Sequence, residues 1–227
     1  MVQDSKRDAW RDVRVAAEYE ARRFRTPLQR LKHRRDERLV LALLASAAGV
    51  RRVLDLPCGT GRLWPALSAA GFSVVGADVA LEMMRVGREK RPDGQATLVQ
   101  ADAEHLPFRS AAFDAVVSLR FLFHLQAAER LSILAEMRRV AQDGVVVGQV
   151  RYRWTLKHLG RWLRSRVGQS SRYRPSQDRR AIESELSAAG LELVTLRPVS
   201  RLFSDKALFL ARPPCPQRSY SCAKNST

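Results

Sequence analysis

The sequence predicts an α/β protein built on a doubly wound, mostly parallel sheet. From residue 51 onward, short apolar runs alternate with helical patterns, as expected for parallel strands that helices cover on both faces. A glycine-rich loop, Gly59-Thr60-Gly61, follows the first run, and Asp78 ends the second. Because open α/β sheets bind ligands at the carboxyl ends of their strands, these residues predict both the fold and the place of the site.

The elements follow from apolar periodicity and from the glycines that end helices. In chain order we expect strand 53–56, helix 62–70, strand 72–77, helix 81–90, strand 96–100, strand 113–118, helix 127–140 and strand 144–150. In the helix over 127–140, a spacing of three residues predicts one buried face made of Leu131, Leu134, Met137 and Val140.

The last two strands differ in their connection. Helix 176–189 leads into strand 191–196, but no helical pattern separates that strand from the next one, 207–211. Two strands joined without a crossover helix form an antiparallel pair. We therefore expect a Rossmann-like sheet of seven strands with the last one antiparallel.

The flanks suggest three parts. Residues 1–50 are expected to form an N-terminal helical cap, whose segment 37–48 is apolar enough to dock on the sheet. Residues 51–211 form the main domain, and 212–227 have no periodicity and are expected to be a flexible tail.

The net charge of +17 points first to nucleic acid or to an anionic membrane. The charge is uneven, however: residues 51–150 are nearly neutral, whereas 151–180 hold ten basic residues and one acidic residue. Residues 154–167 fit an amphipathic basic helix. This insertion could be a lid over the acceptor, a membrane-surface helix, a nucleic-acid contact or an ordinary solvated face.

Cysteine usage and hydropathy limit the compartment. Cys58, Cys215 and Cys222 are an odd, scattered set with neither a disulfide pattern nor zinc spacing, so we expect no metal. The N-terminus is charged and lacks an apolar core. We expect a cytoplasmic protein, with peripheral membrane association left open.

The loop chemistry separates two kinds of nucleotide ligand. A dinucleotide fingerprint needs a third glycine where Trp64 stands, and Asp55 at the start of the loop would repel a pyrophosphate. The same acid suits a cationic amino-acid group. Asp78 can accept both hydroxyls of a ribose, and Asp102 after the third strand can accept from an adenine amine.

These motifs together resemble those of class I S-adenosylmethionine-dependent methyltransferases. The chain is similar to the small-molecule branch that includes the ubiquinone/menaquinone C-methyltransferases. The resemblance covers about residues 51–150 and rests on four segments in order: Val53 to Gly61, Val75 to Val79 with Met83-Met84, Gln100 to Phe108, and Phe113 to Ser118.

The resemblance implies S-adenosyl-L-methionine as cofactor and a role for each matching residue. The methionine part would be held by Asp55, Gly59, Thr60 and Gly61, with Ser118 facing its methyl end. The ribose and adenine would be held by Asp78, Val79, Met83, Asp102 and Ala103.

Histidine and tyrosine side chains could serve the acceptor. His124, just past the fourth strand, is the candidate general base, although a packing role in its loop is also open. His105 is expected to be structural, and Cys58 to pack, because it has no activating base. In relatives, an N-terminal cap can reach the acceptor, and this suggests Tyr19 and Arg23.

The first function hypothesis is methyl transfer to a small aromatic or lipophilic acceptor. The alternative is an RNA methyltransferase that uses the basic patch over 151–180. It would act on a ribose or a ring nitrogen, because residues 118–121 lack the exocyclic-amine motif and no cysteine lies between Cys58 and Cys215 for pyrimidine C5 chemistry. A non-catalytic cofactor-binding module is the third possibility. Trp64 disfavours a nicotinamide oxidoreductase.

Overall fold

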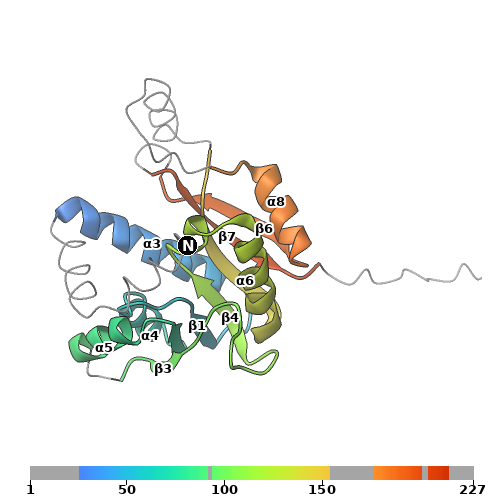
Figure 1. Ribbon diagram of the computed structural model, residues 1–227. Helices are drawn as coiled ribbons and strands as arrows, with labels where there is room; N and C mark the ends of the chain where they lie inside the picture. Colours follow the sequence, from blue (N-terminus) through green and yellow to red (C-terminus); the bar gives the residue numbers. More distant parts are fainter. Residues whose placement is uncertain (1–25, 92–93, 154–175, 201–203, 215–227) are drawn as a thin grey trace, which may run out of the picture.

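A computed structural model describes residues 26–91, 94–153, 176–200 and 204–214 (Figure 1). Its seven strands form one sheet in the order β3-β2-β1-β4-β5-β7-β6. The strands are β1 (Arg52–Asp55), β2 (Ser73–Asp78), β3 (Thr97–Gln100), β4 (Phe113–Ser118), β5 (Ala141–Arg151), β6 (Glu192–Pro198) and β7 (Lys206–Arg212). Only the two pairings of β7, with β5 and with β6, are antiparallel. The expected fold, with an antiparallel last strand, is confirmed.

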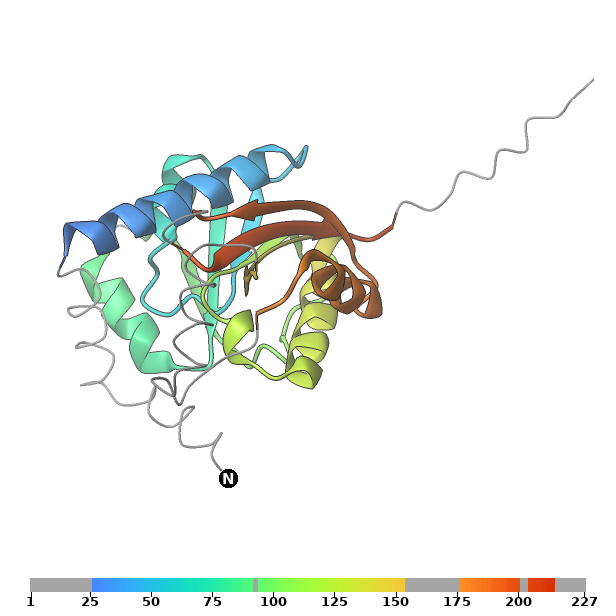
Figure 2. The ribbon, with the colours of Figure 1, turned by 90° about the horizontal axis from the view of Figure 1, so that it is seen from above.

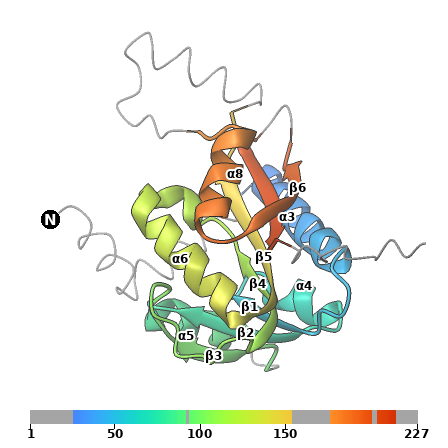
Figure 3. The same cartoon turned by 90° about the vertical axis from the view of Figure 1, so that its right-hand side faces the viewer.

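Helices cover both faces of this sheet. They are α3 (Pro27–Ala45), α4 (Trp64–Ala69), α5 (Leu81–Lys90), α6 (Ala127–Val140) and α8 (Arg179–Ala188), with a short 3₁₀ helix η1 (Leu122–His124). Seen along the sheet, α6 and α8 lie on one side and α3 and α4 on the other (Figure 3). Two large buried clusters, one under each helix layer, form the core.

Local sequence signals explain most element boundaries. Helices α5 and α6 and strand β4 have the bounds that periodicity predicts. Helix α8 starts at Arg179, three residues later than expected, because Asp178 caps it: its carboxylate accepts from the backbone N–H of Ala181 at 2.9 Å. Side-chain capping of this kind fixes where the backbone turns into a helix.

The prediction for the buried face of α6 was wrong at one residue. Leu131 is 37% exposed, and Ile133 is buried in its place beside Leu134, Met137 and Val140. A step of three residues falls 60° short of a full helical turn, so a series spaced by three drifts around the helix. Leu131 is therefore carried away from the core.

Helix α3 is the described part of the N-terminal segment. Thr26 and Gln29 form a capping box at its start, and the residues that it buries against the sheet are Val40, Leu43 and Leu44. Figure 2 shows α3 running beside β7, with which it is in contact. Among the described helices, none has the length and hydropathy to cross a membrane. The division into cap, domain and tail stays a prediction.

Candidate active site

The glycine-rich loop lies between β1 and α4, at the carboxyl edge of the sheet. Gly59 and Gly61 have φ values of +54° and +68°, a region that side chains with a Cβ rarely adopt. At Gly61 a Cβ would lie 2.1 Å from the Trp64 ring, so only glycine fits. The loop thus brings bare backbone to the edge where the strands end.

Two buried carboxylates flank this loop. Asp55 ends β1 and is 3% exposed, and Asp78 ends β2 and is 7% exposed. Asp78 accepts from the N–H of Gly59 at 2.7 Å through one oxygen and from the N–H of Ala80 at 2.9 Å through the other. Each oxygen keeps a second lone pair for a ligand hydroxyl.

Burial raises the pKa of Asp55 to about 8, and the nearby charge of Asp78 adds to the shift. The indole of Trp64 lowers the pKa of Asp55, but by less than burial and Asp78 raise it. Its N–H makes no well-formed hydrogen bond to an acceptor among the described residues. Burial also raises the pKa of Asp78, against the backbone N–H groups that it accepts from. Within the described residues no cation contributes to either shift. The site therefore favours a positively charged ligand.

Two hydroxyl groups at the same edge are buried without a hydrogen-bond partner in the described structure. They are Thr60 Oγ1 in the glycine loop and Ser118 Oγ at the end of β4, and both residues are almost fully buried. Buried polar atoms nearly always find a partner, so an orphaned pair beside a glycine loop indicates a ligand position.

Cys58 lies in the same loop. It is 7% exposed, and burial together with the charges of Asp55 and Asp78 raises the pKa of its thiol. A thiol held protonated is a poor nucleophile, which agrees with the packing role expected for it.

The predicted ribose and adenine residues follow β2 and β3. Met83 is buried, and its Cε lies 3.7 Å from where a Cβ on Gly59 would stand. The carbonyl of Val79 accepts from Gln100 Nε2 at 3.1 Å. Asp102 Oδ1 accepts from the N–H of Glu104 at 3.1 Å, and Ala103 is buried beside it. The structure thus places these residues along one edge with the glycine loop.

His124 belongs to η1, directly after β4. It is exposed to solvent, and its ring centroid lies 4.4 Å from that of Phe123. Phe123 in turn lies under two cations, Lys206 at 4.3 Å and Arg151 at 5.1 Å from its centroid. His105 lies outside this group, in an isolated bridge with Asp102.

Several predictions fall outside the described residues. They are the proposed acceptor contacts Tyr19 and Arg23 and the amphipathic helix over 154–167. Most of the basic insertion 151–180 is also outside, so the membrane and nucleic-acid roles suggested for it stay predictions. No group of His, Cys, Asp and Glu within the described ranges could hold a metal ion.

Sequence reasoning missed the contact between α5 and the glycine loop. Arg91, at the end of α5, donates from Nη1 to the carbonyl oxygen of Thr60 at 2.8 Å. A Cβ on Gly87 would lie 2.8 Å from the same carbonyl group. The small residue inside a helical pattern was the one available signal, because a helix interior disfavours glycine unless something packs closely there.

Comparison with known proteins identifies this arrangement. The family model for a methyltransferase domain matches residues 54–147. Residues 54–147 form a class I S-adenosylmethionine-dependent methyltransferase domain. A solved magnesium protoporphyrin IX methyltransferase from Synechocystis, with bound S-adenosylhomocysteine, shares the fold at a TM-score of 0.75 and 20% identity, over 93% of this chain and 100% of that one.

Two curated relatives each match about half of this chain. The demethylmenaquinone methyltransferase of Renibacterium salmoninarum is 38% identical over 111 residues, which is 49% of this chain and 45% of the relative. The ubiquinone/menaquinone biosynthesis C-methyltransferase UbiE of Pseudomonas paraeruginosa is 38% identical over 122 residues, with the same two shares. The chain thus spans about half the length of the curated relatives it matches.

The geometry of the methyltransferase domain fits S-adenosylmethionine. The cofactor carries a sulfonium and an ammonium, and the two unpaired carboxylates call for positive charge. Its hydroxyls and polar atoms would meet the free lone pairs of Asp78 and the orphaned hydroxyls of Thr60 and Ser118. The roles of individual residues stay predictions, but the chemistry of the donor set is right for this ligand.

Proposed function

We propose that this protein transfers the methyl group of S-adenosylmethionine to a small, aromatic, quinone-like acceptor. The observation that carries the proposal is the buried pair Asp55 and Asp78, which has no cation of its own in the described structure. A ligand with a fixed positive charge relieves their repulsion. The relatives named as demethylmenaquinone and ubiquinone/menaquinone methyltransferases support a quinone-like acceptor.

When bound, the cofactor supplies a sulfonium methyl whose C–S bond breaks as the acceptor atom bonds to the methyl carbon. The protein has to hold the acceptor atom in line with that bond, at roughly 3–3.5 Å from the methyl carbon. Cofactor contacts take up the edge over β1, β2 and β3, where Asp55, Asp78 and Asp102 lie. The acceptor is therefore expected over β4 and β5.

His124 is the proposed base on the acceptor side. It follows β4 within six residues of Ser118, in the loop that also holds Phe121 and Phe123. A quinol hydroxyl that loses its proton pushes electron density into the ring and makes the ring a better nucleophile. An imidazole near neutral pKa is suited to accept that proton.

The test uses S-adenosylmethionine with a labelled methyl group. The full chain is incubated with a short-chain prenylated naphthoquinol, with a total lipid extract, with small metabolites or with RNA, and the label is followed into each fraction. We expect label in the naphthoquinol and lipid fractions. Label in RNA alone would support the RNA methyltransferase instead, and tight S-adenosylhomocysteine binding without transfer to any fraction would support the non-catalytic module.

The role of His124 has its own measurement. His124→Gln is expected to lower kcat about 100-fold with the naphthoquinol while S-adenosylhomocysteine binding stays within twofold, because a positioned base contributes about that much. The pH–rate profile should lose its acidic limb in the variant. An unchanged kcat would mean that His124 only packs against Phe123.

A further inference from the structure

A buried polar network joins three distant parts of the chain at the carboxyl edge of the sheet. Asp36 of α3 is 4% exposed, and its Oδ2 accepts from Arg120 Nη2 at 2.8 Å. Its Oδ1 accepts from Gln149 Nε2 at 3.4 Å. Gln149 Oε1 closes the triangle by accepting from the backbone N–H of Arg120 at 3.2 Å.

Each member lies where the acceptor is expected. Arg120 comes two residues after the end of β4 at Ser118, and Gln149 is fully buried near the carboxyl end of β5. Asp36 lies in the middle of α3, on the same helical face as the core residue Val40 one turn later. The network therefore ties α3 to the half of the edge that the cofactor residues leave open.

The backbone at Arg120 needs such support. Its φ is +60°, an uncommon value for a residue with a side chain, and a strained conformation of this kind persists only where the surrounding structure holds it. The turn at Arg120 sets the direction of residues 121–125, which carry Phe121, η1 and His124. The network holds Arg120 by its guanidinium and by its backbone N–H at once.

We propose that Asp36 and Arg120 are positioning residues that hold the 119–125 loop for acceptor binding. The proposal rests on the function given above, in which the acceptor lies over β4 and β5. Because the network touches neither Asp55 nor Asp78, its loss should impair the acceptor and spare the cofactor. Helix α3 would then cover the acceptor side of the site. Lys32 and His33 lie about one turn before Asp36 on the same helical face.

The test compares Asp36→Asn with Asp114→Asn. Asp114 is a partly buried carboxylate that accepts from the backbone N–H groups of Arg51 and Arg52 at the opposite edge of the sheet, so each variant removes one charge from a hydrogen-bonded carboxylate. Three quantities are measured: KM for the short-chain prenylated naphthoquinol, Kd for S-adenosylhomocysteine by calorimetry, and hydrogen exchange of the amides of residues 119–125.

For Asp36→Asn we expect at least a tenfold rise in the naphthoquinol KM, a Kd for S-adenosylhomocysteine within twofold, and faster exchange over 119–125. Asp114→Asn should change none of the three by more than twofold. Arg120→Lys keeps the charge and should retain part of the wild-type exchange protection over 119–125, whereas Arg120→Gln should retain none.

Two results would overturn the proposal. One is unchanged exchange over 119–125 in Asp36→Asn, and the other is a loss of S-adenosylhomocysteine binding as large as the loss of acceptor binding. If the wild type transfers no methyl group to the naphthoquinol, the proposed function fails while the exchange comparison still decides the role of the network.

A second variant covers the case that Asp36→Asn does not fold. Asp36→Leu with Arg120→Met removes both charges and leaves no unpaired buried ion, a change that is often neutral for stability. Faster exchange over 119–125 in this double variant would support positioning by the network. Exchange at the wild-type rate would overturn it.

Discussion

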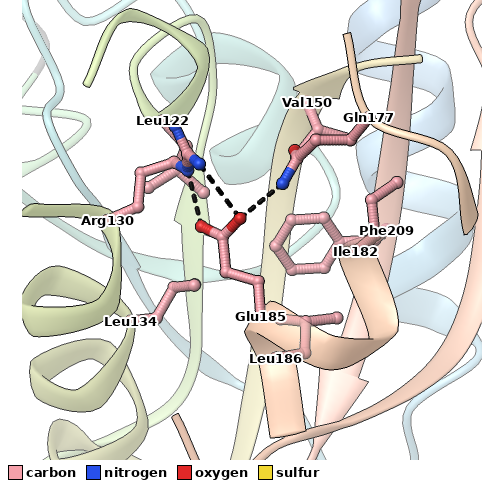
Figure 4. Close-up of a pocket in the computed structure, with 9 residues that line it drawn as sticks. All are labelled: Leu122, Arg130, Leu134, Val150, Gln177, Ile182, Glu185, Leu186 and Phe209. Atoms are coloured by element: carbon pink, nitrogen blue, oxygen red, sulfur yellow. Dashed lines mark hydrogen bonds and ion pairs between the residues drawn. The ribbon is translucent and has the colours of Figure 1, made fainter. Parts of the chain in front are cut away.

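Two regions of this molecule hold carboxylates that are at least partly buried, and the surroundings of these carboxylates differ. On the α6–α8 face, Glu185 receives two hydrogen bonds from the Arg130 guanidinium and one from Gln177 (Figure 4). The small cavity beside it is lined mostly by apolar side chains. At the carboxyl edge, Asp78 lies close enough for its charge to raise the pKa of Asp55, and no cation among the described residues contributes to the shift of either acid.

The contrast separates structural charge from ligand-binding charge. A buried acid that the protein itself neutralises needs nothing further, and Glu185 joins α6 to α8 in this way. A buried pair of acids left without a counter-charge is costly to the folded chain unless a ligand supplies it. None of the residues predicted for the site lines the cavity in Figure 4, which agrees with this division.

The largest expected effect is on stability, at the paired acid. Glu185→Ala leaves the partly buried Arg130 guanidinium without its ion-pair partner, and this costs about 3 kcal/mol, the lower end of the range for a buried pair. Urea unfolding should show that loss in the free energy of unfolding. S-adenosylhomocysteine binding, measured by calorimetry where the variant is folded, should stay within twofold; a large loss of binding would erase the contrast between the two regions.

The next effect is on binding, at the unpaired acids. Asp78→Ala should weaken S-adenosylhomocysteine about 100-fold in calorimetry, because it removes the predicted ribose acceptor and the bonds that fix Gly59 and Ala80. Asp114→Ala is the matched control. Asp114 also accepts two backbone N–H bonds, from Arg51 and Arg52, but at the opposite edge of the sheet. Equal losses of binding in the two variants would show a general effect of destabilisation.

The last effect is a dependence on pH, and over any single pH unit it is the smallest, at most about 1.4 kcal/mol. The pKa of Asp55 rises from 3.8 in the unfolded chain to about 8 in the ligand-free fold, so the folded state favours the protonated acid. Its stabilising contribution is complete below pH 4 and is lost as the pH rises toward 8. The Tm of the ligand-free protein should therefore fall over this range, and Asp55→Asn should flatten that part of the profile.

Binding should show the opposite trend with pH. A cationic ligand favours the ionised form of Asp55, so binding below pH 8 releases a proton and the affinity rises with pH by at most about tenfold per unit. Calorimetry in buffers of different ionisation enthalpy measures this proton. If no proton is released at pH 7 in the wild type, or if Asp55→Asn releases as much, Asp55 is not the group that responds to the ligand.

The sequence predicted the arrangement of β1, β2 and the glycine-rich loop well, because this part of the fold is built from local signals. Apolar runs mark the strands, positive-φ glycines mark the loop, and Asp55 and Asp78 end their strands, so each feature is visible within a few residues. A parallel sheet then brings the strand ends together without further information.

The carboxyl edge over β4 and β5, where the acceptor is proposed to bind, depends on contacts between distant residues. No local sequence pattern reveals such contacts. Asp36 lies 84 positions before Arg120 and 113 positions before Gln149 in the sequence. Taken singly, each looks like an ordinary polar residue: Asp36 of a helix, Arg120 of a loop and Gln149 of a strand. The pairing of Arg130 with Glu185, 55 positions apart, was equally hidden. Such networks form only after packing has placed their members, so the fold had to be known first.

The position of β7 has a consequence for how the chain is synthesised. Strand β6 is made before β7, yet β7 lies between it and β5, with its central residues Ala207 to Ala211 buried. On the ribosome, β6 therefore has no strand to pair with until residue 212 has emerged. During that time, the edge of β5 that later pairs with β7 has unpaired backbone groups. Strand β7 thus joins β6 to the rest of the sheet, and chaperone protection matters most just before β7 emerges.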